Sequence, residues 1–186
     1  MLIETARLVL REVEERDFDA IHSYASDPEV VQYVPWGPNT EQVTRDFIAN
    51  CLAKTAADPR LEFVLAVVPK GEPELVGTVG IYLPSGNAHS GMLGYAYGQG
   101  VWGRGIATEA ARPMMELAFD VLGLDRVWAS CDPDNHGSAR VLEKVGMTLE
   151  GRLRHDQNIR GVLRDSLVWG MLRDEWINPT ERKEPA

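Results

Sequence analysis

Apolar and polar residues alternate at the start of the chain and then change to a helical spacing. The alternating stretch RLVLRE, residues 7–12, predicts a first strand. Helices are expected over about 16–26 and about 40–56, and Asn39 with Gln42 three residues later predicts the cap of the second helix. One face of that helix is apolar. Its apolar positions are Val43, Phe47, Ile48, Cys51 and Leu52.

Three short apolar runs come next, separated by turns rich in glycine and proline. The runs are FVLAVV at 63–68, LVGTVGIYL at 75–83 and GMLGYAYG at 91–98. Such short connections join antiparallel neighbours, because a parallel connection has to cross the sheet. The pattern therefore predicts an antiparallel meander in the middle of the chain.

The second half of the chain returns to helical spacing, with one apolar stripe that ends before Gly123. Pro113 lies inside this stripe and would kink the helix unless it falls within the first turns. The stripe predicts a helix that directly follows the glycine-rich segment. Its positions are Ala107, Ala110, Ala111, Met114, Met115, Ala118, Phe119 and Leu122.

A strand, a short helix and two further strands complete the pattern. The strand is RVWASC at 126–131, and Asp134 or Asn135 can cap the helix after it. The last two strands are expected at about 147–155 and 163–172. This order predicts a mixed α/β (α+β) fold, with one layer of sheet and helices packed on it.

The composition is that of an ordinary globular domain. The chain has 186 residues, of which 44% are apolar and 25% charged. We expect a single domain over 1–177 and a flexible polar tail over 178–186. No apolar run approaches the roughly 20 residues that span a membrane, and the first residues lack the shape of a signal peptide. These features favour a cytoplasmic protein with no membrane partner.

The charge and the cysteines argue against two kinds of site. A formal net charge of −9 disfavours direct binding of nucleic acid, which needs a basic face, and is compatible with a cationic substrate. Cys51 and Cys131 lack the spacing of metal ligands and are expected to be buried and unreactive. We therefore expect no metal site.

Four glycines, Gly98, Gly100, Gly103 and Gly105, stand between a predicted strand and a predicted helix. Residues 98–103 match G-x-G-x-x-G, so one interpretation is a dinucleotide site, with Asp132 at the end of the next strand as the group for a ribose hydroxyl. The surrounding pattern disfavours it, because the preceding strands are joined by tight turns and too few strand–helix units follow.

The other interpretation places an anion at the start of the helix. The first amides of a helix have no intrahelical acceptor, and the helix dipole favours negative charge there. Gly103 and Gly105 would let the backbone of residues 101–107 wrap a pyrophosphate. Thr108 could add a hydroxyl and Arg104 a positive charge, while a tight turn without a ligand stays an alternative.

Four segments of the chain carry a resemblance to a known family. They are ETARLVLREVEERD, GYAYGQGVWGRGIATEA, CDPDNHGSARVLEKVGMTLEGRLR and GVLRDSLVWGMLRDEW. The sequence resembles the GCN5-related N-acetyltransferases (GNAT), and within them the branch of the ribosomal-protein N-terminal acetyltransferases, over about 5–176. The most specific feature is the glycine loop followed by N-x-x-S-x-x-x-x-E-K-x-G, which begins at Asn135.

The resemblance implies a fold and a donor substrate. It implies a mixed, mostly antiparallel sheet of about seven strands with about four helices. The strands at 91–98 and 126–131 would be splayed apart to hold the pantetheine arm of acetyl-CoA. The implied activity is that of an acyltransferase: direct attack of a primary amine on the acetyl thioester.

The resemblance also implies roles for individual residues. The backbone around Tyr95 would pair with the pantetheine, Asn135 would hydrogen-bond to it, and Ser138 would lie near the thioester sulfur as the catalytic acid. A bulge near Gly94 could free an amide for the carbonyl oxygen. The implied acetyl-CoA-binding residues are Tyr95, Ala96, Tyr97, Val101, Trp102, Gly103, Arg104, Gly105, Ile106, Ala107, Thr108, Asn135 and Ser138.

Two positions depart from the family pattern. Gly100 stands where many relatives have glutamine or arginine, so that side chain is not available to the pyrophosphate. Met92 stands where many relatives have a carboxylate, so the general base is left open between Glu62, Asp156 and a water relay. Asp165 is expected to be a structural hydrogen-bond acceptor.

The acceptor is the least determined part of the prediction. The first choice is a protein N-terminal α-amino group, and a small amine or an antibiotic is the alternative. A non-catalytic acyl-CoA-binding sensor with the same fold is a further alternative. The loops at 28–40 and 155–163 are expected to contact the acceptor, with Trp36 forming part of its wall. Monomer and homodimer both stay open.

Overall fold

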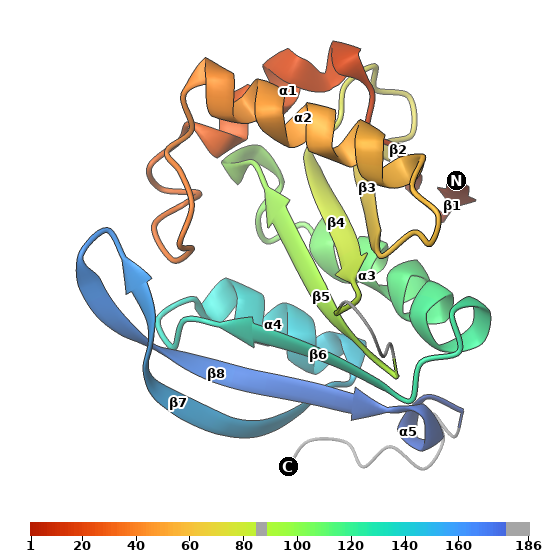
Figure 1. Cartoon of the computed structure of the whole chain (residues 1–186), viewed down its shortest axis with the longest axis vertical. Helices are drawn as coiled ribbons and strands as arrows, with labels where there is room; N and C mark the ends of the chain where they lie inside the picture. The colour runs from red at the N-terminus through yellow and green to blue at the C-terminus, as the bar shows by residue number, and fades with distance from the viewer. Residues whose placement is uncertain (85–88, 178–186) are drawn as a thin grey trace.

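The computed structural model describes residues 1–84 and 89–177. One eight-stranded sheet runs through them in the order β1-β2-β3-β4-β5-β6-β8-β7 (Figure 1). Neighbouring strands are antiparallel except β5 and β6, which are parallel. The strands are β1 (Leu2–Glu4), β2 (Leu8–Glu12), β3 (Glu62–Pro69), β4 (Gly77–Tyr82), β5 (Ser90–Tyr97), β6 (Arg126–Cys131), β7 (Thr148–Ile159) and β8 (Val162–Leu172).

The sheet confirms the predicted fold class and corrects the number of strands. Eight strands are present in the described part of the chain, where about seven were expected. The additional one is β1, whose three residues pair with β2 and are too few to show an alternation. The predicted meander is present as β3, β4 and β5.

Five α-helices accompany the sheet in the described ranges, where about four were expected. They are α1 (Phe18–Ala25), α2 (Glu41–Thr55), α3 (Ile106–Glu116), α4 (His136–Val145) and α5 (Arg173–Ile177). A 3-10 turn, Glu15–Asp17, precedes α1, and a π-helical turn, Leu117–Val121, continues α3. The additional helix, α5, has five residues, too few for a helical pattern.

The cap of α2 differs from the prediction. Thr40 caps this helix, since its hydroxyl accepts a hydrogen bond from the Val43 amide at 3.3 Å. Asn39 instead connects the preceding loop to α1, because its backbone N–H donates to the Ala25 carbonyl at 2.9 Å. Asn135 caps α4, one of the two residues expected to do so.

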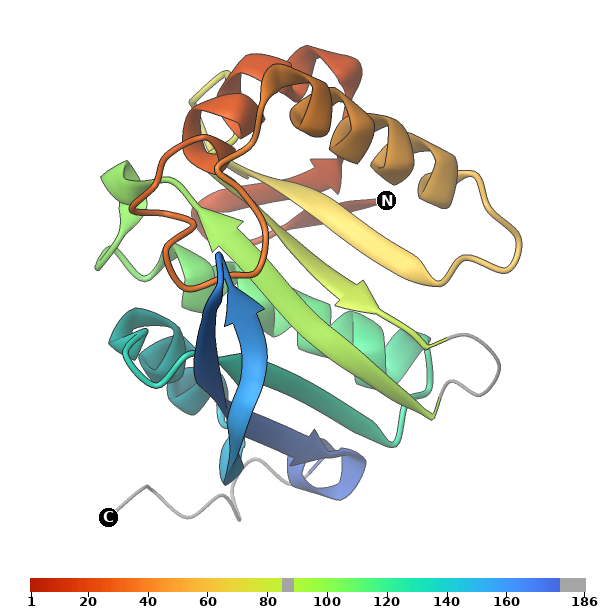
Figure 2. The ribbon, with the colours of Figure 1, turned by 60° about the vertical axis from the view of Figure 1, so that its left-hand side comes forward.

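Helices cover both faces of the sheet, with α1 and α2 on one face and α3 and α4 on the other (Figures 1 and 2). β3 is buried on both faces, and its successive residues divide between two apolar clusters. Phe63, Leu65 and Val67 join the cluster around α3, and Val64, Ala66 and Val68 join the cluster around α1 and α2. Cys51 and Cys131 are buried free thiols, as expected.

The sheet opens between its two parallel strands. β5 and β6 are paired only from Ser90–Arg126 to Met92–Trp128, and beyond these pairs the strands diverge (Figure 2). β6 pairs with β8 as far as Cys131 and Leu167. This is the predicted splay, and it leaves the last residues of β5 without a β6 partner.

No bulge occurs in β5, contrary to expectation. The register between β4 and β5 is unbroken from Gly77–Tyr97 to Tyr82–Met92. Gly94 instead leaves room for the Tyr82 ring, since a Cβ there would lie 3.1 Å from it. Unpaired amides on β5 therefore arise from the divergence of the strands.

The predicted tail at 178–186 lies outside the described residues. Among the helices of the described ranges, none is long and apolar enough to cross a membrane.

Candidate active site

The glycine-rich loop leaves β5 and enters α3 through two left-handed residues. Gly103 has φ 72° and Gly105 has φ 77°, a conformation that costs glycine little and other residues much more. Gly98 has φ −60°, and a Cβ on Gly100 would meet no atom within 4 Å. The backbone geometry thus strongly favours glycine at 103 and 105.

The amides at the start of α3 are free to bind an anion. The first hydrogen bond of the helical repeat runs from the Glu109 amide to the Gly105 carbonyl at 3.0 Å. The amides of Ile106, Ala107 and Thr108 therefore have no acceptor within the helix. Together with the helix dipole they favour negative charge at this end of α3.

Three other amides of the predicted pyrophosphate loop are engaged within the loop itself. Val101 donates to Gly98 at 3.3 Å, Trp102 to Gln99 at 3.0 Å, and Arg104 to Val101 at 3.3 Å. The Trp102 indole also donates to the Tyr97 carbonyl at 3.0 Å. These bonds fix the shape of the loop and leave binding to the amides that follow them.

A polar cluster anchors α3 to the start of the chain. The Glu109 carboxylate accepts hydrogen bonds from the Thr5 hydroxyl at 2.6 Å and from the Arg7 amide and Nε at 2.8 and 2.6 Å. Arg7 also donates to the Arg104 carbonyl at 3.1 Å. Burial raises the pKa of Glu109, but the bonds from Thr5 and Arg7 outweigh burial and lower it. Sequence reasoning missed this anchor, because its partners are about 100 residues apart.

The β5–β6 divergence brings Tyr95 of β5 next to Ser138 of α4. The Tyr95 hydroxyl lies 2.9 Å from Ser138 Oγ and donates to the Ser138 carbonyl at 3.3 Å. Burial raises the pKa of Tyr95, and the bond to Ser138 lowers it only in part, so the phenol stays neutral. Ser138, the predicted catalytic acid, thus has the Tyr95 hydroxyl as a partner, which the sequence did not indicate.

Asn135 and Cys131 complete this side of the site. Asn135 Oδ1 accepts from the Ser138 amide at 3.0 Å, which orients the first turn of α4. The Asn135 amino group has no hydrogen-bond partner among the described residues. Burial raises the pKa of the Cys131 thiol, while contacts with Trp169 and Ser138 lower it in part, and the net result is a neutral thiol.

No candidate base stands out. β5 carries Met92 opposite Trp128 of β6, so no carboxylate points from that position. Glu62 forms an ion pair with Lys54 at 2.9 Å. Hydrogen bonds from Gln157 and then Ser166 lower the pKa of Asp156, which makes it a weaker base. A water relay stays a prediction.

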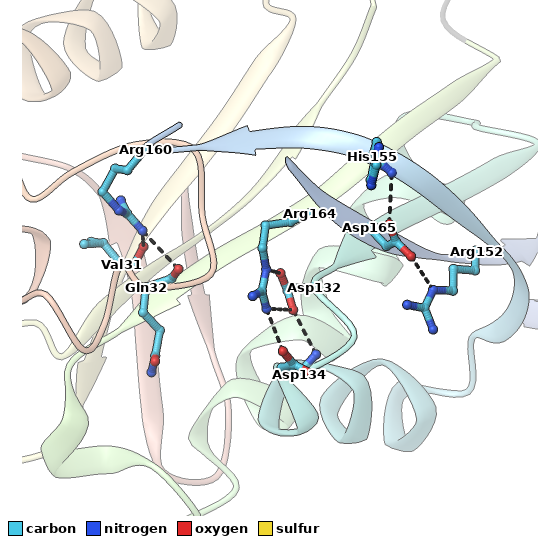
Figure 3. A network of polar contacts seen from close by, with 9 residues as sticks. All are labelled: Val31, Gln32, Asp132, Asp134, Arg152, His155, Arg160, Arg164 and Asp165. Carbon is cyan, nitrogen blue, oxygen red and sulfur yellow. Dashed lines mark hydrogen bonds and ion pairs between the residues drawn. The ribbon is translucent and has the colours of Figure 1, made fainter. Parts of the chain in front are cut away.

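Two ion-pair clusters hold the β7–β8 hairpin (Figure 3). Arg164 binds both oxygens of Asp132 at 2.7 and 2.8 Å and one oxygen of Asp134 at 2.7 Å. Asp165 accepts from the His155 amide at 2.9 Å and from Arg152 Nε at 2.7 Å. Asp165 is therefore a structural acceptor, as expected. Asp132 is engaged by Arg164, which argues against a role in binding ribose.

The chain has clear relatives. It matches the family model described as the acetyltransferase (GNAT) domain over residues 7–148. It is 32% identical over 176 residues to the uncharacterized N-acetyltransferase YnaD of Bacillus subtilis (strain 168), covering 95% of this chain and 99% of the relative.

Solved structures of acetyltransferases are similar to this chain. An acetyltransferase (GNAT family) from Bacillus anthracis is similar with a TM-score of 0.83 at 30% identity, over 94% of this chain and 100% of that one. The ribosomal-protein-S5-alanine acetyltransferase from Vibrio fischeri has a TM-score of 0.80 at 24% identity, over 95% and 98%. At 24% identity, this similarity shows only that the two proteins share a fold.

Proposed function

Because the chain belongs to the GNAT acetyltransferase family and is an N-acetyltransferase, we propose that it moves an acetyl group from acetyl-CoA to a primary amine, with a protein N-terminal α-amino group as first choice. One observation carries the proposal. The free amides at the start of α3 follow the end of β5, and the Tyr95–Ser138 hydroxyl pair joins β5 to α4 across the β5–β6 divergence. The dinucleotide alternative is wrong, because the family and the mostly antiparallel sheet are those of an acetyltransferase.

The donor would bind along β5 and α3. The diphosphate of acetyl-CoA would accept hydrogen bonds from the amides of Gly103 and Gly105 and from those of residues 106–108. The edge of β5 that β6 leaves uncovered, from Tyr95 to Tyr97, would pair with the amides of the pantetheine as a further strand does. The free amino group of Asn135 would donate to the same arm.

The transfer would need the amine to lose a proton, the charge on the carbonyl oxygen to be stabilised, and the leaving thiolate to be protonated. The nitrogen of a neutral amine attacks the thioester carbonyl carbon, a C–N bond forms, and the C–S bond breaks. An unpaired β5 amide would stabilise the charge on the carbonyl oxygen. The Ser138 hydroxyl, held by Tyr95, protonates the thiolate, and the proton that the amine releases to water returns to the Ser138 oxygen.

The lack of a strong base favours an acceptor that deprotonates easily. An α-amino group has a pKa near 8 and lysine one near 10.4, so at pH 7 the neutral fraction of the first is about 230-fold larger. With Met92 in place of a carboxylate, the site offers no strong base to offset that difference. This argument supports a protein N-terminus over a lysine or an alkylamine.

Thermal unfolding with acetyl-CoA and with NADH tests the donor. Acetyl-CoA at about 100 times its Kd should stabilise the protein by about 2.7 kcal/mol, and NADH should give no shift. A shift with NADH alone would contradict the assignment of the loop.

Release of free thiol tests the acceptor. We expect turnover with peptides that have a free N-terminus and none with the same peptides N-acetylated. Turnover with a polyamine alone would favour the small-amine alternative, and binding of acetyl-CoA without turnover on any amine would favour the sensor.

A further inference from the structure

Arg160 joins two segments that are far apart in the sequence. It lies at the tip of the β7–β8 hairpin with φ 50°, in the left-handed region. Its guanidinium donates to four backbone carbonyls of the 28–40 loop, two of which are shown in Figure 3. The acceptors are Val31 at 2.7 Å, Gln32 at 3.0 Å, Gly37 at 3.0 Å and Trp36 at 3.4 Å. We call this group the Arg160 clamp.

The Arg160 clamp adds four hydrogen bonds to a loop that Asn39 already ties to α1. Most of the loop is irregular, and its own hydrogen bonds are few, among them Val31 to Asp27 at 3.2 Å and Val34 to Val31 at 3.2 Å. Val31 is fully buried at the base, whereas Trp36 is 39% exposed. Arg160 therefore holds the outer part of the loop against the hairpin from the opposite end of the chain.

The geometry of the clamp specifies arginine. Its two terminal nitrogens each contact two carbonyls, a fork that the single ammonium of lysine does not reproduce. The same contacts use all four terminal N–H groups of the guanidinium. An anionic ligand would have to displace the loop to reach them, so Arg160 is suited to position a wall and not to bind the acceptor directly.

We propose that Arg160 is a positioning residue of the acceptor site: it fixes the 28–40 loop and the hairpin tip as one wall in front of the β5–β6 divergence. This inference rests on the proposed function. The loop and the tip lie side by side in front of β5, on the side away from α3 and α4 (Figure 2). A multi-residue acceptor that reaches the divergence from this side would contact the wall, and a single-residue amine would not.

The test compares a long and a short acceptor in Arg160→Ala. We expect the KM for a hexapeptide with N-terminal alanine to rise about tenfold, while kcat/KM for alaninamide stays within about twofold. The Kd for acetyl-CoA should not change. Amide hydrogen exchange in residues 31–37 should become faster, and Arg160→Lys should give intermediate values.

Arg154→Ala is the matched control, because it removes the same charge from the same hairpin. Arg154 is exposed and has no polar contact with another described residue, so its variant should match the wild type. An unchanged hexapeptide KM in Arg160→Ala, or equal losses for both acceptors, would overturn the clamp. Wild-type protein that acetylates neither acceptor would instead overturn the proposed function, and the exchange measurement would still report on the loop.

Discussion

At the scale of single residues, the decisive contact is the one between the hydroxyls of Tyr95 and Ser138. A serine hydroxyl rotates freely, and a partner at 2.9 Å limits that rotation. Because burial keeps Tyr95 neutral, the pair does not lose a proton in the working pH range. The contact therefore holds the Ser138 oxygen in place, and either hydroxyl can be the donor.

Replacing Ser138 by alanine should lower kcat about 100-fold and leave the Kd for acetyl-CoA unchanged, because only the step that protonates the sulfur loses a group. Tyr95→Phe should have a smaller effect on kcat, independent of pH between 6 and 10 since its phenol does not titrate there. Steady-state kinetics with binding titrations would measure both.

Ser130→Ala serves as the control for these variants. Ser130 lies on the neighbouring strand β6, is exposed and has no side-chain hydrogen bond to a described residue. Normal turnover in Ser138→Ala would remove the proposed acid role.

At the scale of elements, the loop between β5 and α3 is shaped by two constraints. Gly103 and Gly105 set its turn through their positive φ, and Glu109 ties the first turn of α3 to Arg7 and Thr5. The free amides are thus held in place before a ligand arrives, which lowers the entropy cost of binding.

Gly103→Val should weaken acetyl-CoA binding by at least tenfold. A branched side chain is strained at φ 72°, at a cost of about 1–2 kcal/mol, and the loop would relax away from the binding geometry. A Cβ at this position meets no atom within 4 Å, so the added side chain extends into open space beside the free amides. Calorimetric titration would give the Kd.

Gly71→Val is the matched control, because Gly71 also has positive φ, 88°, and an equally open Cβ position in the turn between β3 and β4. It should lose a similar amount of stability and keep its affinity. Equal affinity in the two variants would contradict the assignment of the loop.

At the scale of the whole molecule, the β7–β8 hairpin is attached at its two ends by different interactions. β8 pairs with β6 along the sheet, and Arg164 joins the outer part of the hairpin to Asp132 and Asp134 before α4. Beyond this, Arg160 reaches the 28–40 loop. The hairpin therefore connects the segment before α4 to the 28–40 loop.

Asp132→Asn should destabilise the protein by about 1 kcal/mol at pH 7, a low value because solvent screens the Arg164 side of the pair. The Arg164 hydrogen bond outweighs burial and lowers the pKa of Asp132. The pKa of Asp132 is thus lower in the folded than in the unfolded state, where it is near 3.9. The ion pair therefore stabilises the folded protein fully at a pH above the unfolded-state pKa, and this stabilisation is lost as the pH falls through the folded-state pKa.

The difference between wild type and Asp132→Asn in urea unfolding should accordingly shrink below pH 4. Asp58→Asn, at an exposed carboxylate without a polar contact to a described residue, should show no such difference. A constant difference between pH 7 and pH 3 would exclude the ion pair as its cause.

The sequence by itself determined the features that depend on neighbours along the chain. The strand at 126–131 has the predicted ends, and the α4 cap at Asn135 and the glycine loop before α3 were expected from local pattern. The family motif was also local, and the match over residues 7–148 confirms it. The local pattern missed β1, because a strand of three residues is too short to show an alternation. It also gave the wrong cap for α2, because Asn39 and Thr40 are adjacent and both can cap a helix.

Only the tertiary structure decided which residues meet. Tyr95 and Ser138 are 43 positions apart, Arg7 and Glu109 are 102 apart, and Arg160 and Val31 are 129 apart. The periodicity of apolar residues indicates which face of a helix or strand is buried. It does not indicate which distant residue a polar side chain will contact in the folded protein. The close approach of Gly94 to the Tyr82 ring on the adjacent strand is likewise a contact that only the fold shows. The glycine-rich loop before α3 was therefore readable in the sequence, and the long-range contacts of Glu109, Ser138 and Arg160 were not.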